Sequence, residues 1–296
     1  MCLISVIIPT YNRIPLLHNA VDSVINQTYS NIEIIIVDNG DLPYEKYIDL
    51  LALSDKIKYI KIPEHGANYA RNKGISVSNG EYVAFLDDDD EWLPTKLEES
   101  LNLFRQNADI GLVFTDKIVI YPDERISYYS HSNFHGDSQK EILLTNFIGT
   151  TSCVMVKRHL LHYNNFDVNM PAYQDHDLWI RLCQLCKVGY LEKPLLKYYQ
   201  RSSLEQISSD YTKYIAACKI MDKKYSTLFA SLSEDERKTI NIYRINGLLL
   251  KALRSQDSKG FWHLLHAQPI EIKIRGIIEW VVGYKGMLRI KSIIHK

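Results

Sequence analysis

The 296-residue sequence lacks several features that would mark common protein classes. Its basic and acidic residues cancel, with 35 of each, so there is no basic field to attract nucleic acid, and we expect no nucleic-acid partner. Uncharged apolar runs stay well short of the ~20 residues that a membrane-spanning helix needs. The chain begins with strand-like residues instead of a basic leader and an apolar stretch, which argues against a signal peptide.

Cysteine is too sparse for a disulfide framework. There are five cysteines, an odd number, and Cys2 stands beside the initiator methionine. Cys183 and Cys186 form a C-x-x-C pair, but no second pair or histidine pair lies nearby in the sequence to complete a zinc site. Both fall in an apolar-periodic run, so we interpret them as buried helix residues. This usage fits a reducing compartment, and we expect a cytoplasmic protein.

What the sequence does contain is a regular alternation of strand and helix signals over its first hundred residues. Short β-branched or aromatic runs predict buried strands, and longer runs between them predict helices. The strands are Ser5–Ile8, Ile32–Val37, Ile57–Ile62 and Tyr82–Leu86, and the helices are Pro15–Asn26, Tyr44–Leu53 and Ala67–Ser78. The alternation predicts an α/β fold, with a mostly parallel central sheet flanked by helices.

The pattern becomes mixed after about Asp109 and almost wholly helical near the end. The mixed part contains strand-like Gly111–Thr115 and Ser152–Val156, a helix at Asp177–Leu185, and a strand pair at Gly189–Leu191 and Leu195–Tyr199. A loop-like stretch suggests a boundary near Ser203. We therefore expect one domain over residues 1–203 and a helical C-terminal region over residues 204–296.

Polar residues follow three of the predicted strands at the point where each ends. They are Pro9–Arg13, Asp38–Asp41 and the four aspartates Asp87–Asp90. In open sheets of this kind, ligands bind beyond the carboxyl ends of the strands. Adjacent carboxylates repel one another, and oxygen ligands suit Mg²⁺ or Mn²⁺, so the aspartate run predicts a metal site. A solvated acidic loop is the alternative interpretation.

These segments carry a resemblance to a known family. Five of them, in order and spacing, resemble the landmarks of the family 2 inverting glycosyltransferases of GT-A fold, and the match spans roughly residues 3–200. The landmarks are Ser5–Asn12, Ile36–Gly40, Ala70–Gly74, Phe85–Trp92 and Gln174–Arg181. Each piece alone is a weak signal, whereas the ordered set is specific.

The resemblance implies a nucleotide-binding site. Pro9, Thr10 and Asn12 would shape the nucleotide pocket, and Asp38 would hydrogen-bond the base. A carboxylate acceptor suits the ring N–H of uracil or thymine, which implies a UDP- or dTDP-sugar donor. Arg71 matches an arginine near the diphosphate, where a planar cationic fork suits phosphate.

The resemblance also implies a metal ligand and a catalytic base. Asp89 would bind Mn²⁺ or Mg²⁺, while Asp87 or Asp88 would contact the ribose or the sugar of the donor. Asp175 aligns with the general base that takes the proton of the acceptor hydroxyl. Where many relatives have a further histidine ligand, this sequence has Gln200-Arg201-Ser202, which puts a third protein ligand in doubt.

The C-terminal tail is basic in a chain that otherwise balances. Residues 251–296 hold nine Lys or Arg and three Asp or Glu, a net charge of +6. Amphipathic helices that combine basic residues and tryptophan lie on membrane surfaces, which suggests peripheral binding to an anionic surface at the inner face of the membrane. Packing of these helices on the catalytic domain is an equal alternative.

The resulting hypothesis is an inverting hexosyltransferase-type enzyme that moves a sugar from a nucleotide diphosphate donor to a hydroxyl of a glycan or lipid-linked glycan. The resemblance implies a role in bacterial surface polysaccharide synthesis. A sugar-phosphate nucleotidyltransferase is one alternative, although the glycine-rich phosphate loop of that class does not occur between Pro9 and Arg13. A catalytically silent sugar-nucleotide-binding partner is another, and Asp175 argues against it.

Overall fold

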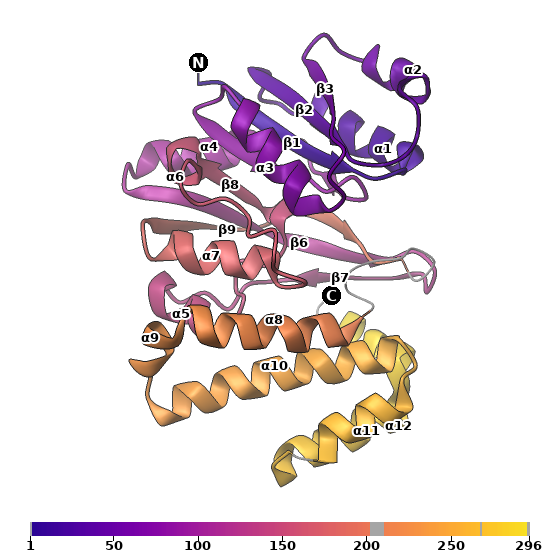
Figure 1. The fold of residues 1–296 in the computed structure, drawn as a ribbon, viewed down its shortest axis with the longest axis vertical. Coiled ribbons are helices and arrows are strands. Elements are labelled where there is room, and N and C mark those ends of the chain that lie inside the picture. The colour runs from indigo at the N-terminus through magenta and orange to yellow at the C-terminus, as the bar shows by residue number, and fades with distance from the viewer. Residues whose placement is uncertain (1, 202–209, 267, 295–296) are drawn as a thin grey trace.

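The computed structural model describes residues 2–201, 210–266 and 268–294, and Figure 1 shows their arrangement. A mixed nine-stranded sheet forms the upper part of the view, and the C-terminal helices lie below it. The predicted boundary near Ser203 lies outside the described residues. All five cysteines are free thiols, in keeping with the sequence.

The first half of the sheet is parallel, as predicted. Its order is β3-β2-β1-β4, and every residue of β1 and β2 is buried. The strands are β1 (Ile4–Thr10), β2 (Ile32–Asp38), β3 (Ile57–Lys61) and β4 (Tyr82–Phe85). Isoleucine and valine fill these strands because branched side chains pack well on a sheet covered on both faces.

Helices α1 (Ile14–Ile25) and α3 (Ala67–Val77) connect these strands where the sequence predicts them. The helix expected at Tyr44–Leu53 is instead a 3₁₀ turn, η1 (Tyr44–Tyr47), followed by the short α2 (Ile48–Leu51). Tyr47 and Leu50 are its buried residues, while Tyr44 and Ile48 are exposed. Too little of this segment faces the core to support a longer helix.

The second half of the sheet is mixed because β8 runs antiparallel to both of its neighbours, β4 and β6. The strands are β5 (Glu91–Trp92), β6 (Ile110–Tyr121), β7 (Ile126–Ser130), β8 (Val154–Lys157) and β9 (Lys187–Tyr199). The expected strand pair at Gly189–Leu191 and Leu195–Tyr199 is one strand, β9, parallel to β6. Its register shifts before Pro194, where the missing N–H interrupts the ladder.

The remaining helices lie against this sheet and below it. They are α4 (Lys96–Gln106), α5 (Ser138–Leu144), α6 (Arg158–Leu161), α7 (Gln174–Cys183), α8 (Tyr211–Lys224), α9 (Ser226–Ala230), α10 (Glu234–Arg254), α11 (Ser258–His266) and α12 (Ile270–Ile294), with a 3₁₀ turn, η2 (Thr151–Cys153), before β8. In Figure 1, α8 and α10 form a layer under the sheet, with α11 at the bottom.

The C-terminal helices have their own small core. Leu249, Phe261 and Leu265 are buried together between α10 and α11, with Trp280 of α12 packed against them. Leu288 of α12 joins the core formed by β6 and β7, so this helix also reaches the sheet. Within the part of the chain that the structure describes, no helix combines the length and apolarity needed to cross a bilayer.

Candidate active site

A cavity of about 530 Å³ lies at the edge where β1 and β4 end, as the strand-end rule predicts. Seven of the nine predicted site residues line it. They are Pro9, Thr10, Arg71, Asp87, Asp88, Asp89 and Asp175. These residues come from four separate segments of the sequence, and the fold brings them together in one cavity.

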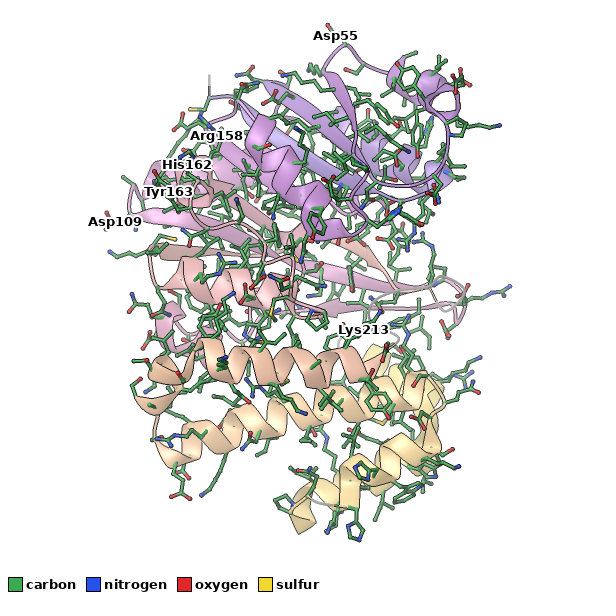
Figure 2. All side chains as sticks on the ribbon, viewed as in Figure 1. Asp55, Asp109, Arg158, His162, Tyr163 and Lys213 are labelled. Atoms are coloured by element: carbon green, nitrogen blue, oxygen red, sulfur yellow. The ribbon has the colours of Figure 1, made fainter. Side chains whose placement is uncertain are left out.

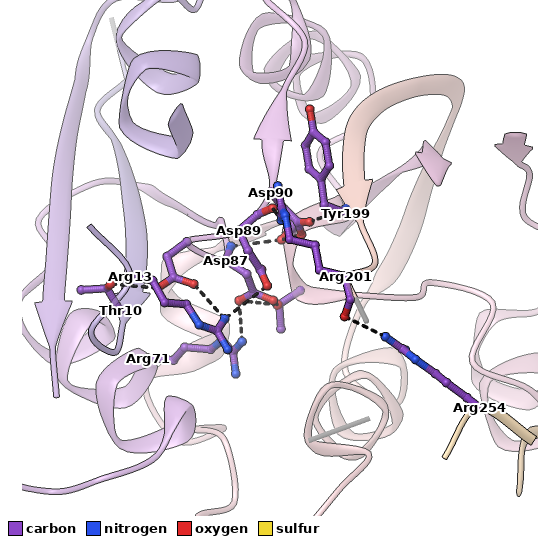
Figure 3. A network of polar contacts seen from close by, with 12 residues as sticks. Thr10, Arg13, Arg71, Asp87, Asp89, Asp90, Tyr199, Arg201 and Arg254 are labelled. Atoms are coloured by element: carbon purple, nitrogen blue, oxygen red, sulfur yellow. Dashed lines mark hydrogen bonds and ion pairs between the residues drawn. The ribbon is translucent and has the colours of Figure 1, made fainter. Parts of the chain in front are cut away.

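The four aspartates divide between the cavity and the core, and Figure 3 labels three of them, Asp87, Asp89 and Asp90. Asp87 accepts a hydrogen bond from Arg71 Nη2 at 2.5 Å and from Thr151 Oγ1 at 3.1 Å. Asp90 is turned inward, where it accepts a hydrogen bond from Ser152 Oγ at 2.6 Å and another from the backbone N–H of Tyr199 at 3.1 Å. Asp90 therefore fixes the loop after β4 to its neighbours and leaves the other three carboxylates to the cavity.

Asp88 and Asp89 share one cation. Arg13 Nη1 lies 3.4 Å from Asp88 Oδ1 and 3.2 Å from Asp89 Oδ2. Asp88 also accepts a hydrogen bond from Thr10 Oγ1 at 2.8 Å. Burial, reinforced by the charge of Asp89, still raises the pKa of Asp88 to about 7. Burial and the charge of Asp87 raise the pKa of Asp89 above its ordinary value.

The donor set fits a divalent metal held together with a diphosphate. Carboxylate oxygens suit Mg²⁺ or Mn²⁺, and the raised pKa values of Asp88 and Asp89 show that this cluster favours more positive charge than Arg13 supplies. Over the described ranges, no group of three or more His, Cys, Asp or Glu side chains is arranged to hold an ion by itself. Phosphate and water oxygens would therefore have to complete the coordination, as is usual for Mg²⁺.

Two predicted residues, Asn12 and Asp38, are not among the cavity-lining residues. Asp38 is fully buried, and its carboxylate accepts hydrogen bonds from Tyr59 at 2.6 Å, Lys61 at 2.8 Å and the Gly40 N–H at 2.8 Å. Asn12 has a left-handed φ of 57°, and its side-chain oxygen accepts from the Asp41 N–H at 2.7 Å. In this arrangement both side chains organise the loop after β2, and the buried carboxylate of Asp38 has one acceptor site on Oδ1 beyond these three hydrogen bonds.

Asp175 lies at the start of α7, on the cavity wall. Its carboxylate accepts a hydrogen bond from the backbone N–H of His176 at 2.7 Å, and Asn146 Nδ2 lies 3.5 Å away. Burial raises the pKa of Asp175. Tyr173, which precedes the helix, has a left-handed φ of 54°, and such strained residues tend to occur at functional sites.

The neighbours of Asp175 in α7 are structural. His176 is buried and its Nε2 lies 2.7 Å from the carbonyl oxygen of Ile142. Asp177 is buried, and its carboxylate lies 2.7 Å from the Tyr225 hydroxyl and 2.9 Å from Arg181 Nη2. The helix therefore presents a single carboxylate to the cavity, the one at Asp175.

Several cavity residues have no role predicted from the sequence. Tyr11, Arg13 and Asn39 lie within the polar segments identified at the strand ends, but no role is assigned to them there. Tyr214 of α8 and Lys251 of α10 lie in the helical C-terminal region, where only helical periodicity is visible. The residues that sequence reasoning missed are Tyr11, Arg13, Asn39, Gly66, Ala67, Asn146, Thr150, Thr151, Tyr173, Gln174, Tyr198, Tyr199, Tyr214 and Lys251.

Comparison with known sequences finds similar proteins. Residues 5–163 match the family model described as Glycosyl transferase family 2. An uncharacterized glycosyltransferase of Rickettsia felis is 27% identical over 241 residues, which cover 79% of this chain and 39% of that protein. The amylovoran biosynthesis glycosyltransferase AmsB of Erwinia amylovora is 30% identical over 220 residues, which cover 66% of this chain and 69% of AmsB. This chain thus spans about two fifths of the length of the Rickettsia protein.

Solved structures share the fold at low sequence identity. S. aureus TarS in complex with UDP-GlcNAc matches with a TM-score of 0.61 at 16% identity, covering 99% of this chain and 88% of that chain. Mannosyltransferase PcManGT from Pyrobaculum calidifontis, in complex with GDP-Man and Mn²⁺, matches with a TM-score of 0.60 at 15% identity, covering 98% and 86%. The expected GT-A fold is confirmed by these likenesses.

Proposed function

Because the chain belongs to glycosyl transferase family 2, we propose that it transfers a sugar from a nucleotide diphosphate donor to a hydroxyl of a glycan or lipid-linked glycan, with inversion at the sugar. The observation that carries this proposal is that one cavity holds the acidic cluster Asp87–Asp89, its arginines and the separate carboxylate of Asp175. The name of AmsB, an amylovoran biosynthesis glycosyltransferase, supports a role in bacterial surface polysaccharide synthesis.

The donor would bind along the ends of β1 and β4. Pro9, Thr10 and Asn39 line the part of the cavity next to the first strand, where the nucleotide would lie. Asp38 would act there through the loop that it holds, or directly through the acceptor site that Oδ1 has left. Arg71, already oriented by Asp87, would face the diphosphate. TarS with UDP-GlcNAc supports a uridine nucleotide, whereas the complex of PcManGT has GDP-Man.

Asp89 would hold Mn²⁺ or Mg²⁺, and Asp87 and Asp88 would contact the donor. When bound, the ion would stabilise the negative charge of the departing diphosphate. The Mn²⁺ in the PcManGT complex supports such an ion here. Arg13 pairs with both Asp88 and Asp89, and it would have to share these carboxylates with the incoming cation.

Asp175 would act as the general base. It would take the proton of the acceptor hydroxyl as that oxygen bonds to the anomeric carbon and the bond to the diphosphate oxygen breaks. The raised pKa of this partly buried carboxyl makes it a stronger base than an exposed aspartate. Asn146, 3.5 Å away, would help to orient it.

The two regions expected from the sequence have different roles in this proposal. Residues 1–203 would bind the donor and carry the chemistry, while residues 204–296 would complete the cavity and attach the protein to an anionic membrane surface. Helix α12, which is broken by the non-helical backbone of Gly283, supports attachment because apolar side chains are exposed beside basic ones on both sides of the break. The apolar residues are Ile274, Ile277, Ile278, Val281, Ile290, Ile293 and Ile294, and the exposed basic residues are Arg275, Lys285 and Arg289.

Titration of UDP into purified protein, with and without Mn²⁺, tests the proposal together with two variants. Wild type should bind UDP more tightly with Mn²⁺, and Asp89→Asn should lose that gain. Asp175→Asn should bind UDP like wild type but consume the sugar donor about 10²–10⁴-fold more slowly, the usual contribution of a general base. Donor turnover by Asp175→Asn within a few-fold of wild type would remove Asp175 from the mechanism.

The substrates that the protein consumes separate the alternative functions. A sugar-phosphate nucleotidyltransferase would consume a nucleoside triphosphate together with a sugar phosphate, and it would release pyrophosphate. A catalytically silent partner would bind UDP and leave the sugar donor intact in every variant. Either result would replace the transferase proposal.

A further inference from the structure

The C-terminal helices place a lysine without a polar partner in the wall of the active-site cavity. Lys251 of α10 lines the cavity together with Tyr214 of α8 and Asp175. Its ammonium group lies 4.1 Å from the centre of the Tyr214 ring. Over the part of the chain that the structure describes, the ammonium group of Lys251 makes no hydrogen bond and no ion pair, while its backbone carbonyl oxygen accepts from the Ser255 N–H at 2.9 Å. A partly buried ammonium in this position has three donors available for a ligand.

The residues around Lys251 are themselves held in place by packing. The ring of Tyr214 packs edge-on against Tyr173 at 4.8 Å, and Tyr173 holds the strained turn that begins α7. Burial lowers the pKa of Lys251 to about 8, the positive charge of Arg254 acts in the same direction, and the negative charge of Asp175 opposes both. Burying a charged ammonium group costs free energy, and a lysine on the solvated face of α10 would avoid this cost. An anion bound beside Lys251 would offset it.

Basic residues outnumber acidic ones around Lys251, where Asp175 is the nearby carboxylate. Arg254, one turn of α10 beyond Lys251 on the carboxyl side, donates to Gln200 Oε1 at 2.6 Å and to the carbonyl oxygen of Arg201 at 3.2 Å, as Figure 3 shows for Arg201. Arg201 stacks over the Tyr199 ring at 4.6 Å and donates from Nη1 to the backbone carbonyl oxygen of Asp89 at 3.1 Å. The side chains of Asp87 and Asp89 pair instead with Arg71 and Arg13.

We propose that Lys251, on its Tyr214 platform, forms a subsite for a phosphate group carried by the acceptor, next to the hydroxyl that Asp175 deprotonates. This inference rests on the proposed function and narrows its acceptor from any glycan to a phosphorylated one. A phosphate oxygen would accept hydrogen bonds from the ammonium group, and the tyrosine ring would hold the lysine stem in place. A lipid carrier and a glycan can each carry such a phosphate, and the chemistry of the subsite is the same for both.

The test uses protein saturated with UDP and Mn²⁺, so that the diphosphate position is filled. Glycerol 3-phosphate is then titrated by calorimetry, with glycerol as the uncharged comparison, at constant ionic strength. Wild type should bind glycerol 3-phosphate and not glycerol, and Lys251→Met should weaken that binding by about tenfold or more, the loss of one charge-assisted hydrogen bond. Lys251→Arg should retain most of the binding, and both variants should bind UDP as wild type does.

Lys213→Met is the matched control, since Lys213 is on α8 beside Tyr214 but is exposed to solvent (Figure 2). It should bind glycerol 3-phosphate like wild type. Geranyl phosphate distinguishes the sources, because tighter binding than glycerol 3-phosphate indicates a lipid carrier, and equal binding indicates a phosphorylated glycan. Unchanged glycerol 3-phosphate affinity in Lys251→Met overturns the proposal. So does weakened UDP affinity in that variant, which would assign Lys251 to the donor. Failure of wild type to bind UDP at all would instead remove the proposed function on which the subsite depends.

Discussion

The buried imidazole of His176 gives the protein a measurable dependence of stability on pH. Burial lowers its pKa to about 4, against about 6.5 in an unfolded chain. The unfolded state therefore binds more protons between these values, so stability is fully present above pH 6.5 and is lost as the pH falls toward 4. His176 alone should cost about 2 kcal/mol of unfolding free energy between pH 7 and pH 5.

The variant His176→Gln tests this assignment, because its amide can still donate to the Ile142 carbonyl but does not titrate. Urea unfolding at pH 7 and pH 5 should show a smaller loss of stability in the variant than in wild type. The other titrating groups, Asp88 included, are present in both proteins and cancel in the comparison. Parallel losses in the two proteins would show that His176 is not the group that titrates.

Among single side chains, the sequence predicts which residues meet at the sheet edge, while the role of each stays a prediction. Asp87, Asp89 and Asp175 lie in the same cavity because strand ends and a helix start meet at one edge of the sheet. It does not reach the orientation of Asp38, which depends on Tyr59 and on other partners brought in by the fold. The hydrogen bonds of a buried carboxylate are a tertiary property, and the local sequence does not encode them.

For helices and strands, close packing should decide the effect of a small substitution. Gly74 of α3 faces β1, and a Cβ atom there would lie 2.4 Å from Ile7 Cγ2. Gly74→Ala should therefore destabilise the protein by about 1–3 kcal/mol through overpacking. Gly247, in the middle of α10, is the matched control, since its Cβ would meet only the Tyr173 hydroxyl at 3.7 Å. Gly247→Ala should stabilise by about 0.5–1 kcal/mol because alanine is the better helix former.

Chemical denaturation of both variants checks this pair. A loss of stability in both would mean that α10 cannot accept a methyl group, and stabilisation in both would mean that the contact between α3 and β1 is loose.

Packing against neighbouring elements also explains which strands the sequence predicts correctly. The strands β1 and β2 are recognisable because their whole lengths are buried, whereas the single strand β9 is misread as two at Pro194 because its register shift depends on the facing β6.

At the scale of the whole molecule, α12 packs on the rest of the protein and also leaves apolar side chains exposed. Leu288 packs with Val119 and Tyr121 of the sheet, as a soluble docking helix would. Trp280, which the sequence suggests as a membrane anchor, lies 5.0 Å from the Phe261 ring and packs in the small C-terminal core. The sequence could not separate these interpretations, because an amphipathic pattern fixes which face is apolar and not what covers it.

The proposed membrane attachment would depend on the apolar residues that α12 leaves exposed. Ile278 and Val281, 55% and 78% exposed, lie on it, so the double variant Ile278→Asn, Val281→Asn should fold normally and lose most of its binding to vesicles containing anionic lipid. The control Ile242→Asn removes an exposed apolar residue from α10 and should bind like wild type. Cosedimentation at 0.15 M and 1 M salt measures both, and the basic residues should make wild-type binding weaker at high salt, since each is worth ~1 kcal/mol near an anionic surface. Equal sedimentation of the double variant and wild type would place the membrane contact elsewhere on the protein. If wild type stays in the supernatant at low salt, the protein does not bind the membrane surface, and the acceptor must reach the cavity in another way.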